Sequence, residues 1–187
     1  MSVRDAVAHD LLLAAGFDAF ARHGFRRTTM SDIAQAAGLS RPALYLRVTG
    51  KEEVLRLVGA ALLANSVEKA RSAADGEGGV AERLTAALDA KLDLTLGLAE
   101  RSEHALELLE EYARVAAEDA AQYEATMRTI AEQILADTGA PPRQRSEIAA
   151  ALVHTVQGLE AELNNPVRAR HVLHALTRVV AAGLTSG

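Results

Sequence analysis

Apolar residues recur along most of the chain at the three- and four-residue spacing of an amphipathic helix. Leu13 and Phe17 show this spacing and predict a first helix over about residues 5–23, which Gly24 ends. The same pattern predicts longer helices over about residues 52–74, 80–98, 102–137, from 143 onward and 166–184. An interruption is expected near residues 116–120, where no large apolar residue continues the stripe. No segment alternates like a strand, so the expected fold class is all-α.

Two short helices joined by a sharp turn are predicted between residues 24 and 51. Thr29 is a good N-cap for the first of them, and Asp32 can close a capping box with it while favouring the positive end of the helix dipole. This helix is expected to run over Met30–Ala37, and Gly38 then lets the chain reverse. A helix, a glycine turn and a second capped helix in this order are typical of a helix-turn-helix.

The second short helix is polar on the side that would face away from the core. Ser40 is its expected N-cap, and Pro42 stands in the first turn, where a missing N–H is harmless. The apolar Leu44 would bind it to the preceding helix. The outward positions are Arg41, Ala43, Tyr45, Leu46 and Arg47. In a recognition helix an Arg can read guanine, an Ala can touch a thymine methyl and a Tyr hydroxyl can bind a phosphate.

Basic residues are concentrated in the same region. Residues 1–56 carry eight Lys and Arg side chains against six acidic ones, whereas the rest of the chain carries 12 basic and 19 acidic ones. Residues 22–51 hold six bases and one acid. A short basic region on a chain of net charge −5 indicates a local surface for a polyanion. Charge alone leaves open that these Arg side chains are simply solvated.

Composition excludes several classes of protein. Alanine supplies 39 of 187 residues and aromatic residues only 3%, which favours closely packed helices. The absence of Cys excludes disulfides, thiolate metal sites and cysteine nucleophiles. Mean hydropathy is +0.04, no apolar run could cross a bilayer and the first ten residues resemble no signal peptide, so we expect a cytoplasmic protein without a membrane partner. No H-E-x-x-H, phosphate-binding glycine loop or G-x-S-x-G motif is present, so neither catalysis nor a cofactor is expected.

Residues 11–58 resemble the N-terminal domain of the TetR family of bacterial transcriptional regulators. The matching features are the first helix ending at Gly24-Phe25, Thr28-Thr29, Asp32-Ile33-Ala34, Ala37-Gly38, Leu44-Tyr45 and Lys51-Glu52. Two positions depart from the family pattern. Val48 stands where the family usually has a Phe that anchors the recognition helix, and Leu46 where a polar or aromatic residue is common. Val48 still supplies an apolar plug, so we expect the fold to hold.

The resemblance implies a three-helix helix-turn-helix DNA-binding domain over residues 1–51 and a larger helical ligand-binding and dimerisation domain over residues 52–187. It implies phosphate contacts from Thr29, Ser40, Tyr45 and Lys51. The residues nearest the base edges would be Arg41, Pro42, Ala43 and Arg47, and the backbone beside the groove would be touched by Arg26 and Arg27. The expected partner is double-stranded DNA, bound more weakly as salt rises because each phosphate contact releases counterions.

Two apolar stripes in the last helices are candidates for a homodimer interface. They consist of Leu152, Val156, Leu159 and Leu163, followed by Leu173, Leu176, Val180 and Leu184. Such stripes can pack on their symmetry mates as a four-helix bundle. The alternative is that both stripes are buried in the core of one chain. A dimer would set two recognition helices about one DNA turn, or a multiple, apart.

Few features indicate a ligand site. The expected ligand is an unidentified small molecule, with candidate contacts His104, Glu107, Tyr112, His154 and Gln157. Each of these is also typical of a surface or satisfied core position. Only Tyr112 and Tyr123 are aromatic after residue 51, which disfavours a pocket that stacks planar compounds. His171 and His174 are three residues apart, but no Cys and no carboxylate at ligand spacing accompanies them, so no metal site is expected.

The sequence therefore favours a dimeric, ligand-responsive DNA-binding regulator, a repressor that a small molecule releases from a near-palindromic operator. Ligand binding would favour a state whose recognition helices no longer match the groove spacing, so the affinities for ligand and DNA would be linked. Two alternatives stay open. One is an all-helical enzyme or small-molecule carrier with an incidental helix-turn-helix, and the other is a regulator that answers to a protein partner instead of an inducer.

Overall fold

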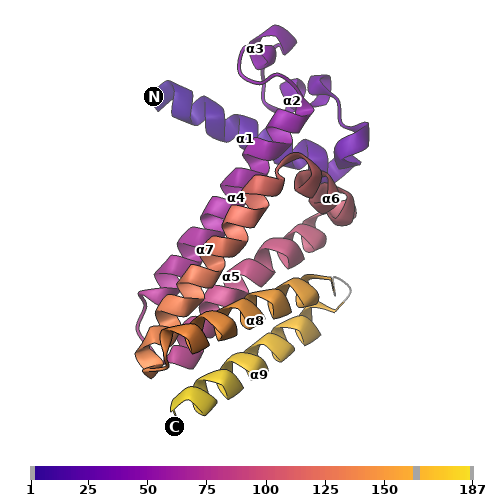
Figure 1. Cartoon of the computed structure of the whole chain (residues 1–187). Coiled ribbons are helices and arrows are strands. Elements are labelled where there is room, and N and C mark those ends of the chain that lie inside the picture. Colours follow the sequence, from indigo (N-terminus) through magenta and orange to yellow (C-terminus); the bar gives the residue numbers. More distant parts are fainter. Residues whose placement is uncertain (1–2, 162–164, 186–187) are drawn as a thin grey trace. The chain divides into compact units, whose positions relative to one another are not determined.

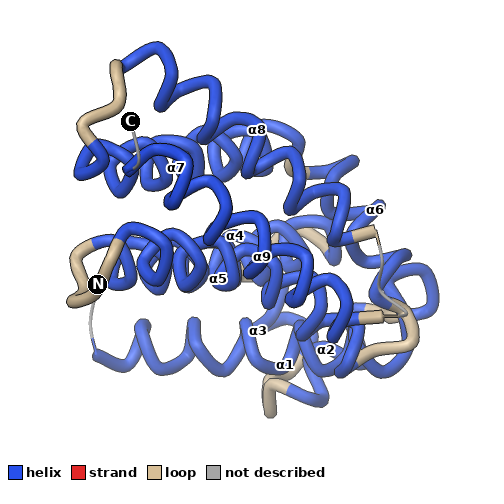
Figure 2. The backbone as a smooth tube through the Cα atoms, turned by 90° about the horizontal axis from the view of Figure 1, so that it is seen from below, coloured by secondary structure: helices blue, strands red, loops and turns tan. Residues whose placement is uncertain are grey.

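The computed structural model describes residues 3–161 and 165–185, which are helical almost throughout (Figures 1 and 2). No strand occurs in these residues, in agreement with the all-α prediction. The α-helices of the described residues are α1 (Val3–Arg27), α2 (Met30–Ala36), α3 (Arg41–Tyr45), α4 (Lys51–Ala74), α5 (Val80–Arg101), α6 (Ala105–Val115), α7 (Ala117–Leu135), α8 (Pro142–Glu160) and α9 (Pro166–Thr185), and a 3-10 turn η1 (Ala136–Thr138) follows α7. None of the helices in this part of the chain is long and apolar enough to span a bilayer.

Most helix ends fall where the sequence predicts a break. The expected interruption near residues 116–120 is present, because α6 and α7 are separated at Ala116. The end of α1 differs from the prediction, since helical residues continue to Arg27. Gly24 nevertheless leaves helical geometry, with φ 74° and ψ 162°, so α1 consists of two helical pieces joined by a kink. Glycine is the residue that adopts such a positive φ most readily.

The chain divides into two compact units, each with its own hydrophobic core. The first unit comprises residues 1–62 and 98–120, and the second comprises residues 63–97 and 121–187. The first unit therefore contains α1 to α3, the first half of α4, and α6. The functional boundary expected after residue 51 stays a prediction.

The core of the first unit holds its short helices in place. Phe20 of α1, Ile33 of α2, Leu44 of α3 and Val54 of α4 are each at most 1% exposed and belong to one cluster. The Phe20 ring also lies 5.6 Å from the ring of Phe25, between centroids. Isolated helices as short as α2 and α3 are unstable in water, so tertiary packing of this kind is what maintains them.

The core of the second unit is formed by the later helices and part of α4. Leu92 of α5, Ile130 of α7, Val156 of α8 and Leu173 of α9 are each at most 1% exposed and share one cluster. Within this unit α8 and α9 lie side by side (Figure 1).

The apolar stripes expected at a dimer interface face this core instead. Four of their residues are at most 6% exposed within the single chain: Leu152, Val156, Leu159 and Leu173. Three more are partly buried against the same cluster: Leu176, Val180 and Leu184. Leu163 lies outside the described residues. Because a side chain without accessible surface cannot touch a second copy, the alternative of burial in one chain's own core describes Leu152, Val156, Leu159 and Leu173.

Candidate nucleic-acid interface

A capping box begins α2. Thr29 Oγ1 accepts a hydrogen bond from the backbone N–H of Asp32 at 3.3 Å, and Asp32 Oδ2 accepts one from the N–H of Thr29 at 2.8 Å. The Thr29 hydroxyl also donates to Asp32 Oδ2 at 2.7 Å. These bonds, from the side chain of Thr29 first and its backbone second, lower the pKa of Asp32. Asp32, the one acidic residue in the basic stretch 22–51, therefore caps the start of α2.

The turn from α2 to α3 follows the predicted chemistry. Gly38 has φ 65°, in the left-handed region, and the N–H of Leu39 donates to a carbonyl of α2 at 2.8 Å. Ser40 Oγ then accepts from the N–H of Ala43 at 3.3 Å, and Pro42 stands in the first turn of α3. The N-caps, the turn glycine and the proline of the helix-turn-helix prediction are all confirmed.

One side of α3 is anchored in the core of the first unit. Leu44 is 0% exposed and Val48, just beyond the helix, is 2% exposed. Both belong to the cluster that contains Phe20 and Ile33. Val48 therefore fills the anchoring role expected of it, although it is smaller than a Phe.

The other side of α3 faces solvent. Its exposed residues are Arg41, Pro42, Tyr45, Leu46 and Arg47. Tyr45 is 49% and Leu46 89% exposed, whereas Ala43 is only partly exposed. Neither Arg41 nor Arg47 makes a side-chain hydrogen bond or ion pair with the described part of the chain. Two cations and a phenol hydroxyl are thus available to a partner.

Arg26 and Arg27 at the end of α1 are exposed as well. The Arg26 side chain is 74% exposed, with Nε 3.6 Å from Glu111 Oε1. An ion pair this open to water is weak and leaves the guanidinium able to approach a phosphate.

The Lys51 ammonium does not point into solvent as a phosphate contact would. It donates to the carbonyl oxygens of Phe25 at 2.9 Å, Arg26 at 3.1 Å and Thr28 at 3.3 Å, and lies 4.6 Å from the centroid of the Phe25 ring. Three acceptors account for the three protons of an ammonium. In this structure Lys51 therefore ties the start of α4 to the end of α1, a role that its spacing in the sequence does not reveal.

Two expected ligand contacts pack against α1. Glu107 Oε1 accepts a hydrogen bond from the backbone N–H of Arg26 at 2.8 Å. A Cβ added at Gly24 would lie 2.5 Å from Glu107 Oε2 and 3.2 Å from His104 Cγ. Ser102, just before α6, donates its hydroxyl to a carbonyl of α1 at 2.8 Å. Sequence reasoning missed this attachment because it joins residues 81 positions apart.

The other ligand candidates are divided between the two units. Tyr112 of the first unit packs on Gly59, where an added Cβ would lie 2.0 Å from the ring. The Tyr112 hydroxyl is buried and has no hydrogen-bond partner among the described residues, and burial raises its pKa. His154 and Gln157 of the second unit are exposed on α8. The five candidates therefore form no single cluster within either unit.

A buried ionic cluster lies in the second unit. Lys91 of α5 is 2% exposed and donates to Glu124 Oε1 at 2.7 Å and Glu160 Oε1 at 2.9 Å. Its ammonium also lies 5.4 Å from the centroid of the Tyr123 ring. Burial raises the pKa of Glu160, against the lowering effect of Lys91. Two partly exposed carboxylates thus share one buried ammonium.

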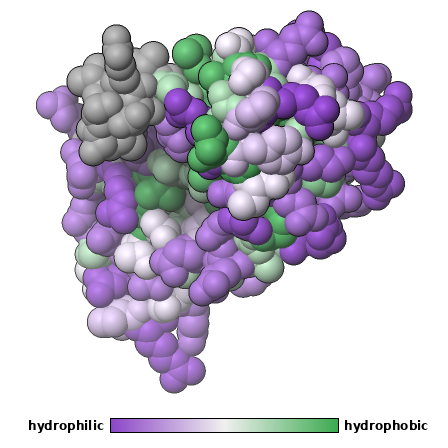
Figure 3. All heavy atoms as spheres, turned by 90° about the horizontal axis from the view of Figure 1, so that it is seen from above, coloured by the Kyte–Doolittle hydropathy of each residue, from purple (hydrophilic) through white to green (hydrophobic). Residues whose placement is uncertain are grey.

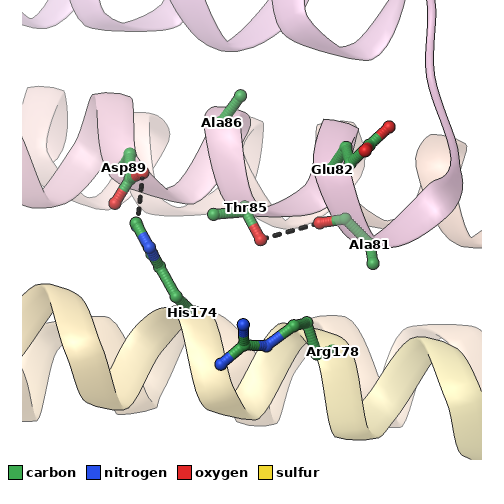
Figure 4. Close-up of a pocket in the computed structure, with 7 residues that line it drawn as sticks. All are labelled: Ala81, Glu82, Thr85, Ala86, Asp89, His174 and Arg178. Atoms are coloured by element: carbon green, nitrogen blue, oxygen red, sulfur yellow. Dashed lines mark hydrogen bonds and ion pairs between the residues drawn. The ribbon is translucent and has the colours of Figure 1, made fainter.

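An open groove of about 330 Å³ lies between α5 and α9 (Figure 4). In it, His174 of α9 points toward Asp89 of α5, with Nε2 2.7 Å from Oδ2, and burial raises the pKa of Asp89. None of the five ligand candidates lines this groove. No group of three or more potential metal-ligating side chains occurs in the described residues.

Residues 12–58 match the family described as "Bacterial regulatory proteins, tetR family". Solved structures resemble the chain over nearly its full length. A transcriptional regulator from Rhodococcus sp. RHA1 is 24% identical with a TM-score of 0.74, covering 94% of this chain and 96% of that one. The TetR family transcriptional regulator PfmR from Thermus thermophilus is 20% identical with a TM-score of 0.60, covering 91% and 97%. The transcriptional regulator FadR from Bacillus subtilis, solved in complex with stearoyl-CoA, is 19% identical with a TM-score of 0.61, covering 95% and 97%.

Proposed function

With residues 12–58 this chain carries the N-terminal domain of the TetR family of bacterial regulatory proteins, and on that premise we propose that it is a dimeric DNA-binding repressor, released from a near-palindromic operator by a small molecule. One observation carries the DNA-binding part. Buried Leu44 holds α3 from one side, and Arg41, Tyr45 and Arg47 stand exposed on the other.

The exposed residues suit the chemistry of a duplex. An Arg can bind the O6 and N7 of guanine with two hydrogen bonds, and a Tyr hydroxyl can bind a phosphate oxygen. Thr29 and Ser40 stand at the starts of α2 and α3, where backbone N–H groups favour an anion. Arg41 and Arg47 are therefore assigned to base edges, and Tyr45, Thr29 and Ser40 to phosphates. Lys51 is assigned to neither group, and supports DNA binding by holding the start of α4 against the end of α1.

A gel-shift assay on the DNA upstream of the chain's own coding region tests this assignment. Binding is expected to weaken steeply as salt rises, and Arg41→Ala and Arg47→Ala should reduce the affinity. Arg143→Ala is the matched control, because that side chain is 91% exposed on α8 of the second unit. No salt-sensitive shift at any protein concentration would favour a small-molecule carrier or enzyme instead.

The homodimer requires a different surface from the buried stripes. On α9, Val172 is 40% and Val179 69% exposed, and Ala175 between them is exposed too. The spacing 172, 175, 179 places the three side chains on one helix face. On the neighbouring α8, Ala151 and Gly158 are exposed and lie seven residues apart, as Val172 and Val179 do on α9. Small and β-branched side chains let helices approach closely, so this face is assigned to the symmetry-related copy.

Analytical ultracentrifugation tests the assignment of that face. Val179→Glu is expected to shift the wild-type dimer toward monomer, because it would place a charge in an apolar contact. Leu106→Glu is the control, since Leu106 is 63% exposed on α6. A wild-type chain that stays monomeric, or an unchanged dimer in Val179→Glu, would reject the assignment.

The ligand response rests on the attachment of α6 to the end of α1. Glu107 on α6 accepts a hydrogen bond from the Arg26 amide on α1, so a displacement of α6 within the first unit would also move α1. Because α1 and α3 share one hydrophobic core, this movement would reach the helix that is proposed to bind DNA. The hydroxyl of Tyr112 on α6, which has no hydrogen-bond partner in the described part of the chain, offers one hydrogen bond to a ligand. Because a structural neighbour was solved with stearoyl-CoA, long-chain acyl compounds are the first ligands to test.

Thermal shift and gel shift together test the ligand response. A compound that binds the folded chain raises its melting temperature, and an inducer also releases the DNA. Acyl-CoA thioesters of increasing chain length are the probes, with free coenzyme A as the control. If no compound raises the melting temperature while DNA binding is intact, a regulator that answers to a protein partner is favoured.

A further inference from the structure

Leu46 is the most exposed large hydrophobic residue of the described part of the chain. It is 89% exposed and follows α3 directly as its C-cap, with φ −73° and ψ −13°. A single exposed Leu is common on protein surfaces, so exposure by itself indicates no partner. Leu46 also stands at the end of α3, the helix that is proposed to enter the DNA groove.

The backbone of α3 determines the direction of this side chain. The N–H of Leu46 donates to the carbonyl of Pro42 at 3.1 Å, so the two residues are one helical turn apart on the same face. Leu44, two residues earlier, lies about 200° around the helix and is 0% exposed in the core. Pro42 and Leu46 therefore form an apolar edge directed away from the protein.

Cations border this apolar edge. Arg41 precedes Pro42 and Arg47 follows Leu46, and both are exposed. Of the six bases of residues 22–51 only Lys51 is engaged with backbone carbonyls of the described residues, and the one acid of that stretch is engaged in the capping box of α2. A partner of this surface must therefore be strongly anionic and yet present an apolar group between its polar ones.

In the major groove of DNA the C5-methyl of thymine is the one apolar group among donors and acceptors. We propose that Leu46 reads a thymine methyl, and so determines part of the operator sequence. This inference rests on the proposed function, because it requires α3 to enter the groove. The face of the molecule drawn in Figure 3 is largely hydrophilic, with smaller hydrophobic areas among the polar side chains.

Thymine-to-uracil substitution in the DNA tests the inference. The probe is a duplex selected from random-sequence DNA by the full-length wild-type chain, remade with deoxyuridine in place of each thymine in turn. At one position in each half-site the loss of the methyl should weaken wild-type binding by about fourfold, the effect of one buried methyl group. Leu46→Ala should bind the parent duplex more weakly by a similar factor and show no further loss at that position.

Two controls separate methyl reading from general loss of affinity. Leu46→Met keeps an apolar side chain and should keep the dependence on the methyl. Leu106→Ala removes a Leu that is 63% exposed on α6 and should bind every duplex as the wild type does. Both substitutions are on the surface, so folding should be unaffected.

The outcomes separate this inference from the proposed function. If the selection enriches no sequence, both are overturned. If a sequence is enriched but no uracil position weakens the wild type, or Leu46→Ala shows the same uracil losses as the wild type, only the role of Leu46 is overturned. Loss of the methyl dependence in Leu46→Ala, with its retention in Leu46→Met, supports it.

Discussion

Glu107 Oε1 accepts a hydrogen bond from the backbone N–H of Arg26 at 2.8 Å, and this contact joins α6 to the end of α1. It lies beside Gly24, whose φ of 74° and lack of a Cβ admit the carboxylate. The kink in α1 and the position of α6 are therefore parts of one arrangement. Glu107, a candidate ligand contact, thus supports the end of α1.

Substitution at Gly24 should disrupt this arrangement. Gly24→Ala places a Cβ 2.5 Å from Glu107 Oε2 at a positive φ, and we expect a loss of about 1–3 kcal/mol in the free energy of unfolding. Urea denaturation measures it. Gly97→Ala is the control, because Gly97 lies within α5 with open space around its Cβ and should gain slightly in stability. Equal stability of Gly24→Ala and wild type would contradict the close approach.

Lys51 should contribute to folding more than to phosphate binding. Lys51→Met removes the donor to the carbonyls of Phe25, Arg26 and Thr28, and we expect a loss of about 1–3 kcal/mol in stability. Arg47→Met, at an exposed position, should change stability by less than about 0.5 kcal/mol while weakening DNA binding. Thermal unfolding and gel shift of both variants decide the matter. A fully stable Lys51→Met that no longer binds DNA would restore the phosphate role.

The buried Lys91 should be essential for the second unit. Lys91→Met leaves Glu124 and Glu160 without their shared cation, and the expected loss is about 3–5 kcal/mol. Lys69→Met on the exposed side of α4 is the control and should have little effect. Denaturant titrations compare them. A Lys91→Met chain as stable as wild type would show that both carboxylates take up protons without cost.

The stability of the chain should depend on pH through Glu160. Burial raises the pKa of Glu160 above its usual 4.5, so the folded state holds the proton more tightly than the unfolded state. The stabilisation that this tighter proton binding gives the folded state is fully present below about pH 4.5 and is lost as the pH rises through the folded-state pKa of Glu160. Glu160→Gln should therefore gain stability relative to wild type as pH is raised through that window. Melting temperatures from pH 4 to 7 measure it, with exposed Glu110→Gln showing no such trend.

The two tyrosines after residue 51 should respond oppositely to loss of their hydroxyl groups. The Tyr112 hydroxyl is buried and has no hydrogen-bond partner within residues 3–161 and 165–185, so Tyr112→Phe should be neutral or more stable by up to about 1 kcal/mol. The Tyr123 hydroxyl lies 2.8 Å from Ser66 Oγ, so Tyr123→Phe should lose about 1 kcal/mol. If Tyr112 contacts the inducer, its Phe variant will also lose the ligand-dependent thermal shift. Destabilisation of Tyr112→Phe would reveal a partner for its hydroxyl.

The DNA-binding helices could be predicted from the sequence because their signals are local. Thr29 and Asp32, three residues apart, cap α2, and Ser40 caps α3 through the amide of the residue three positions later. The turn between the two helices depends on a single residue, Gly38, with its positive φ. Helix periodicity likewise needs only neighbours at three and four residues. The apolar stripe of α8 was recognised for the same reason, but its spacing left open whether it faces the chain's own core or a second copy.

The amino-acid order by itself determined the all-helical class, the capped helix-turn-helix and the basic character of residues 22–51. Only the tertiary structure decided that Leu152 and Leu173 face the chain's own core, that Lys51 binds carbonyls at the end of α1 and that Glu107 supports Arg26. An apolar stripe specifies that a helix face is buried, but its partner is chosen by the packing of distant segments. A long polar side chain likewise takes whichever acceptor the fold brings within about 3 Å, and no spacing along the chain encodes that encounter.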